Sequence, residues 1–100
     1  MNPDDLNGTN VIDTKGNVVG EIGGLDIDIV NLRIAKIYVN LSDYAIEKLG
    51  YEKKLLGNVQ IELPIKIVNS IRDVVVINKS TSELKAIIKT SEETKEKTNS

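Results

Sequence analysis

Three aspartates in the first third of the chain have a spacing that could support chemistry. Asp26 and Asp28 stand two positions apart in an alternating run, so on a β-strand both carboxylates project to the same side. A hairpin would bring Asp13 close to them, and such a group could hold a hard cation or do general acid–base work. No other ligand and no pocket accompany them, and a half-exposed strand shows the same alternation. We therefore expect a solvated strand face and assign no catalytic residue, metal ligand or cofactor.

Glycines are the second candidate constellation. Gly16, Gly20, Gly23 and Gly24 fit neither the P-loop nor the dinucleotide-binding fingerprint, and no helix follows them. Backbone geometry explains them better than phosphate binding does. The pair Gly16-Asn17 is free to take positive φ at a hairpin turn, and Gly20 inside the next strand indicates a bulge, a bend or a close backbone approach.

Composition excludes several classes of function. The 100-residue chain has a net charge of −2, no Cys and no His, which rules out disulfides, thiolate nucleophiles and the commonest general base. Lys53-Lys54 with Arg33, Lys36 and Lys48 could touch phosphates. With only three aromatic residues and no basic stripe, however, nucleic-acid binding is not expected. No apolar run reaches the roughly 20 residues of a membrane helix, so we expect a cytoplasmic protein without membrane insertion.

Most of the elements that position these residues are predicted strands. Residues 11–13 and 18–30 form a hairpin, and Asn31-Leu32 turns the chain into a third strand over 33–41. Ile34 and Ile37 have opposite parity in that strand. They share one face only if a bulge intervenes near Ala35-Lys36.

The second half combines short helices with two further strands. Residues 42–50 form a helical insertion with Ser42 as its N-cap and Gly50 as its left-handed end. Apolar residues alternate with polar ones from Val59 to Ile67, where Pro64 requires a strand edge or a strand end. The positions assigned to turns and bends are Gly8, Gly16, Gly20 and Pro64.

The most apolar strand and the last helix supply a candidate surface. Residues 74–77 are apolar at every position, which indicates a central strand or one whose outer face meets a partner. Ser80 and Glu83 form a capping box, followed by an apolar stripe that either packs across the barrel or binds a partner. The candidate dimer or partner surface is Val74, Val75, Val76, Ile77, Leu84, Ile87 and Ile88.

We divide the chain into a polar lead-in (1–6), one β domain (7–79), a C-terminal helix (80–89) and a disordered polar tail (90–100). The core lacks Phe and Trp, and pairing with a second copy would compensate for its modest size. We therefore expect a homodimer.

Two blocks of the chain resemble a PRC-barrel domain. They are Asn7-Gly8, Val11–Asp13, Lys15-Gly16, Val19-Gly20 and Leu25–Asp28, and then Ile61–Ile65, Val68, Ile71 and Asp73–Ile77. One departure is Arg72-Asp73, where the family often has Gly-Asp. The resemblance implies an all-β fold: a small, strongly bent barrel of five or six strands with a short helical insertion and a C-terminal helix.

The resemblance also implies a function. Small stand-alone PRC-barrel proteins are common in archaea. Some, of the CdpB type, are cell-division adaptors that link SepF to the FtsZ-based machinery. We therefore expect a non-catalytic interaction module that is recruited to the division site. The alternative is a ribosome-associated maturation factor, since the C-terminal half of RimM, which grips a ribosomal protein, is also a PRC barrel.

Overall fold

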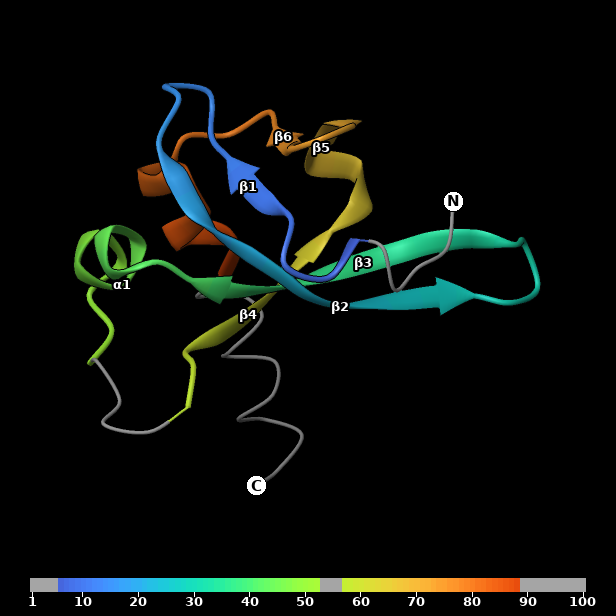
Figure 1. The fold of residues 1–100 in the computed structure, drawn as a ribbon, viewed down its shortest axis with the longest axis horizontal. Helices are drawn as coiled ribbons and strands as arrows, with labels where there is room; N and C mark the ends of the chain where they lie inside the picture. The colour runs from blue at the N-terminus through green and yellow to red at the C-terminus, as the bar shows by residue number, and fades with distance from the viewer. Residues whose placement is uncertain (1–5, 53–56, 89–100) are drawn as a thin grey trace.

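A computed structural model describes residues 6–52 and 57–88 of the chain, which form one curled sheet with two short helices (Figure 1). The predicted tail (90–100), most of the lead-in and the Lys53-Lys54 pair lie outside the described residues. The elements are β1 (Asn10–Ile12), β2 (Val18–Asp28), β3 (Arg33–Leu41), α1 (Asp43–Leu49), β4 (Gln60–Pro64), the 3-10 turn η2 (Ile65–Ile67), β5 (Val68–Ile71) and β6 (Val75–Ile77). Residues 81–88 form the C-terminal helix.

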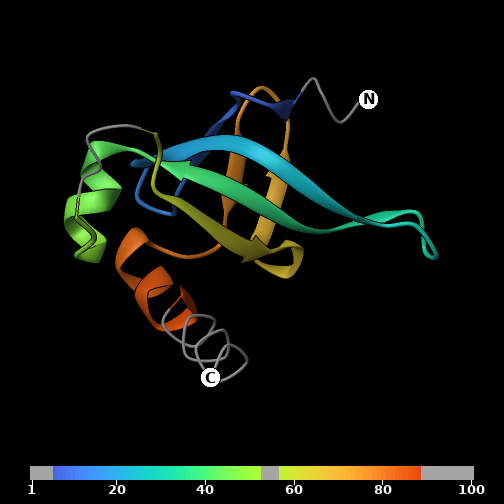
Figure 2. The ribbon, with the colours of Figure 1, turned by 90° about the horizontal axis from the view of Figure 1, so that it is seen from below.

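The sheet has the order β4-β3-β2-β1-β6-β5, and all neighbours are antiparallel except β1 and β6. Its two outermost strands, β4 and β5, are consecutive in the chain and joined only by the three residues of η2. The sheet must therefore curl until its ends come together, as Figure 2 shows. Among the described residues no ladder joins β4 to β5, so the strand-rich fold is confirmed while the expected barrel is not closed.

Pro64 explains why the sheet ends where it does. The alternation from Val59 predicted a strand through Ile67, but the ladder with β3 stops at Lys36 opposite Pro64, and η2 begins at the next residue. Proline has no N–H to donate, so β4 cannot continue a regular ladder through this position. The chain instead turns inward, and Ile67 is buried in the core.

Both predicted helix caps are present. Ser42 Oγ accepts a hydrogen bond from the backbone N–H of Ala45 at the start of α1, and Gly50 ends that helix with φ +81°. At the C-terminal helix, the backbone N–H of Ser80 donates to Glu83 Oε1 (2.8 Å) and the N–H of Glu83 donates to Ser80 Oγ (3.3 Å). This reciprocal pair is a capping box.

Three glycines occupy positions that other residues would strain. Gly16 turns the first hairpin with φ +83°, whereas Asn17 does not take a positive φ. Gly20 lies on β2 directly against β3, where an added Cβ would stand 2.9 Å from the carbonyl carbon of Asn40. Gly20 therefore permits the backbones of β2 and β3 to approach each other closely. Gly8 takes a positive φ of +85° at the turn before β1.

The most apolar strand, β6, is central, with β1 on one side and β5 on the other. Val75 and Ile77 are each about 1% exposed and point into the core, as do Leu84 and Ile88 of the C-terminal helix. The expected partner surface is therefore corrected for these four residues, because a side chain buried within its own chain cannot meet a partner. Val76 is half-buried and Val74 is 36% exposed.

Candidate protein-interaction surface

Asp13 does not join the other two aspartates. It is buried at the first hairpin turn, where its Oδ1 accepts hydrogen bonds from the backbone N–H groups of Lys15 and Asn17, each 2.9 Å away. Its Oδ2 accepts two more from Thr81, the first residue of the C-terminal helix. Asp13 therefore ties a turn to a helix, a structural role that the sequence reasoning missed.

The hydrogen bonds also decide the charge state of Asp13. Burial raises the pKa of this carboxyl, but the bonds from Thr81, Asn17 and Lys15 together outweigh burial and lower the pKa to about 2. The carboxylate is thus ionised at neutral pH with all four of its bonds made. Nothing in this arrangement leaves the group free to exchange a proton with a substrate.

Asp26 and Asp28 lie on the hairpin formed by β2 and β3, on its polar face. Lys36 Nζ stands 3.8 Å from Asp26 Oδ2 and 3.4 Å from Glu62 Oε2 on β4. The nearby charge of Glu62 is the main cause that raises the pKa of Lys36. Within residues 6–52 and 57–88, no group of three acidic side chains is placed to hold a metal ion.

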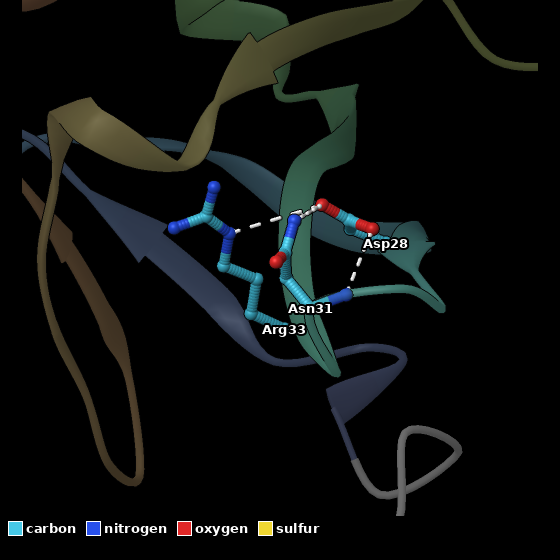
Figure 3. A network of polar contacts seen from close by, with 3 residues as sticks. All are labelled: Asp28, Asn31 and Arg33. Atoms are coloured by element: carbon cyan, nitrogen blue, oxygen red, sulfur yellow. Dashed lines mark hydrogen bonds and ion pairs between the residues drawn. The ribbon is translucent and has the colours of Figure 1, made fainter.

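Asp28 closes the turn of this hairpin (Figure 3). Its Oδ1 accepts the backbone N–H of Asn31 (3.2 Å), its Oδ2 accepts the Asn31 side-chain amide (2.8 Å), and Arg33 Nε stands 3.9 Å from Oδ2. The Asn31 side-chain bond is the main cause that lowers the pKa of Asp28. These contacts link the two ends of the turn although its residues are exposed.

The outer part of the hairpin is a two-stranded ribbon. Pairing of β1 with β2 reaches only to Glu21, and pairing of β4 with β3 ends at Lys36, whereas β2 and β3 stay paired out to Asp28 and Arg33. Figures 1 and 2 both show this end of the hairpin extending away from the rest of the described chain. A two-stranded ribbon by itself is marginally stable in water, so an additional contact would benefit it.

One face of the ribbon is apolar and continues the core outward. Ile37 is fully buried, Leu25 opposite it and Ile34 are half-buried, and Ile27 is 42% exposed. The register shifts between the pairs Asp26–Lys36 and Ile27–Ile34, so β3 contains one extra residue there. This is the predicted bulge, and it places Ile34 and Ile37 on one face.

The tip of the ribbon is the most exposed apolar group among the described residues. Ile29 is 79% exposed, Val30 89% and Leu32 84%. Leu32 also has φ +52° and is the one described non-glycine residue with a positive φ. A branched side chain in that conformation is uncommon and marks a site worth a functional hypothesis. The signal available in the sequence was three large aliphatic residues at a turn, where polar residues are usual.

A pocket lies at the base of the same hairpin. It has a volume of about 540 Å³ and is lined by Ala35 and Lys36 of β3, Leu63 and Pro64 of β4, and Ala86 and Ile87 of the C-terminal helix. Figure 2 shows this helix beneath β4, on one side of the sheet. Glu62 and Lys66 complete the lining. Of the seven residues assigned to a partner surface, Ile87 is the one that reaches this pocket.

No helix among the described residues combines the length and the apolar character needed to cross a membrane. No known protein family matches this chain, and no curated protein is significantly similar to it.

Proposed function

We propose that this chain is a non-catalytic protein–protein interaction module on a PRC-type barrel, and that the projecting β2–β3 hairpin is one of its association surfaces. The observation that carries the proposal is the exposure of Ile29, Val30 and Leu32 at the hairpin tip. Burying one such aliphatic side chain is worth roughly 1.5–3 kcal/mol. Burial of all three side chains against a partner would therefore contribute substantially to the free energy of binding.

The hydrogen bonds within the tip support the same function. The bonds of Asp28 to Asn31 hold the turn before any partner arrives. A surface that is already ordered loses less conformational entropy on binding. Leu32 is kept in a strained left-handed conformation while its side chain stays in water. A protein under selection for stability alone would place glycine or asparagine there.

The resemblance to the PRC-barrel family supports the cellular role that we propose. Under it the chain is a cytoplasmic adaptor of the CdpB type, recruited to the division site to link SepF with the FtsZ-based machinery. A curled six-stranded sheet whose end strands meet at η2 is compatible with such a barrel.

Affinity purification from the native host tests this function. The bait is the full chain, compared with a tip variant (Ile29→Ser, Val30→Ser and Leu32→Ser together) and with a body variant (Val18→Ser), whose residue is exposed away from the tip. We expect the native chain and the body variant to enrich the same proteins and the tip variant to lose them.

The identity of the enriched proteins separates the roles. Division proteins support the adaptor role, and ribosomal proteins support the ribosome-associated alternative. If the native chain enriches neither, and if its profile and its self-association match those of the tip variant, the interaction module itself is excluded.

A further inference from the structure

The hairpin carries two features of complementary shape. Its tip is convex, apolar and highly exposed, and its base borders an open pocket of about 540 Å³. Both lie on one ribbon: Leu32 ends the turn, and Ala35 of β3, which lines the pocket, follows three residues later.

We propose that a second copy of this chain occupies both features. Two hairpins cross in antiparallel orientation about a twofold axis, and the tip of each enters the pocket at the base of the other. The inference rests on the proposed function, because it names the occupant of the same association surface. A twofold interface is self-complementary. One twofold rotation therefore places the tip of each chain in the pocket of the other chain.

The chemistry of the pocket suits the tip. Leu63, Pro64 and Ile87 offer apolar surface, and Ala86 is a small residue at the exposed side of the C-terminal helix. This clasped dimer, in which each tip lies in the pocket of the other chain, removes three large aliphatic side chains of each chain from water, which is favourable.

Charge favours the same orientation. The pocket lining contains two lysines, Lys36 and Lys66, against one glutamate, Glu62. Lys36 already pairs with Asp26 and Glu62 of its own chain, so among the described ion pairs Lys66 is the lysine of the lining without an acidic partner. Asp28 flanks the tip that would approach this lysine. The two aspartates also disfavour an anionic lipid surface as the occupant.

The test is a charge-pair rescue measured by analytical ultracentrifugation over a dilution series. Val30→Asp places a carboxylate on the tip, and Ala86→Arg places a guanidinium in the pocket. Both positions are exposed, so circular dichroism melting should show both variants folded. Each variant alone should have a dimer Kd raised at least about tenfold.

An equimolar mixture of the two variants should recover the dimer. In the mixed dimer one tip–pocket contact is native, and the other pairs the new aspartate with the new arginine. The control is Val18→Asp, which adds the same charge at the far end of β2 and should leave the Kd of the native chain unchanged.

Three results would overturn the clasp. They are a native chain that stays monomeric throughout the dilution series, a dimer that Val30→Asp or Ala86→Arg leaves intact, and a mixture that fails to recover the dimer. Failure of the proposed function is a different observation. If the dimer is absent while the tip variant still loses proteins that the native chain captures from its host, the clasp is excluded and the interaction module stands.

Discussion

Asp13 accepts two hydrogen bonds from Thr81, which follows it by 68 positions. Asp13 Oδ2 lies 2.9 Å from the backbone nitrogen of Thr81 and 2.7 Å from its Oγ1. Asp13 Oδ1 meanwhile holds the hairpin turn through Lys15 and Asn17. One carboxylate thus joins the first turn of the sheet to the first turn of the C-terminal helix, whose Leu84 and Ile88 fill the core.

Replacing Asp13 should therefore destabilise the whole domain. Asp13→Asn turns an amide N–H₂ toward groups that donate, so we expect a loss on the order of 1–3 kcal/mol in the free energy of unfolding. Thr81→Val removes only the hydroxyl donor and should cost less. Urea denaturation measures both, and Asp26→Asn on the exposed face is the matched control. If Asp13→Asn costs no more than Asp26→Asn, the link is not structural.

The same carboxylate predicts acid sensitivity. The pKa of Asp13 is lowered from 3.8 to about 2 in the folded chain, so the unfolded state binds more protons between these values. The stabilisation is therefore complete above the unfolded pKa and is lost as the pH falls through about 2. We expect the native chain to lose on the order of 1–2 kcal/mol more than Asp13→Asn between pH 5 and pH 2. Parallel pH profiles of stability for the two proteins would contradict this assignment.

Any side chain at position 20 should lower the stability of the fold. Gly20→Val drives a Cβ against the carbonyl group of Asn40 on the neighbouring strand, so despite valine's strand propensity we expect a loss of roughly 1–3 kcal/mol. Gly24→Ala is the control, because its Cβ would meet Tyr38 Cδ2 at 3.4 Å, an ordinary contact. Denaturant midpoints compare the two. A Gly20→Val protein as stable as the native chain would show that the strands separate there at little cost.

Replacing Leu32 should have opposite effects on the stability of the chain and on its self-association. Leu32→Asn keeps the residue count of the turn, tolerates φ +52° better and removes an exposed aliphatic side chain. We expect the free energy of unfolding to stay equal or to rise by roughly 0.5–1 kcal/mol, while self-association weakens. Thermal melting and ultracentrifugation of the same sample measure both. A variant that associates as tightly as the native chain would remove Leu32 from the interface.

Features that depend on close neighbours in the chain were predicted from the sequence. Ser42, Gly50 and the Ser80–Glu83 box act within a single helical turn, so their types and spacing were sufficient. The parity of the apolar residues required a bulge near Ala35 for one shared face, and the structure has that bulge. The missing N–H of Pro64 required a strand edge or a strand end, and the structure has the end. Each of these predictions required no knowledge of what lies across the sheet.

What lies across the sheet was decided by the tertiary structure alone. Val75 and Ile77 face inward because β6 inserts beside β1, which precedes it by more than 60 residues. Asp13 is buried and ionised because the C-terminal helix packs against it through Thr81. No pattern of neighbouring residues in the sequence predicts that contact. The apolar hairpin tip stands in water because β1 and β4 stop short of it. Sequence periodicity determines which residues share a face, but only the path of the whole chain determines which face is covered.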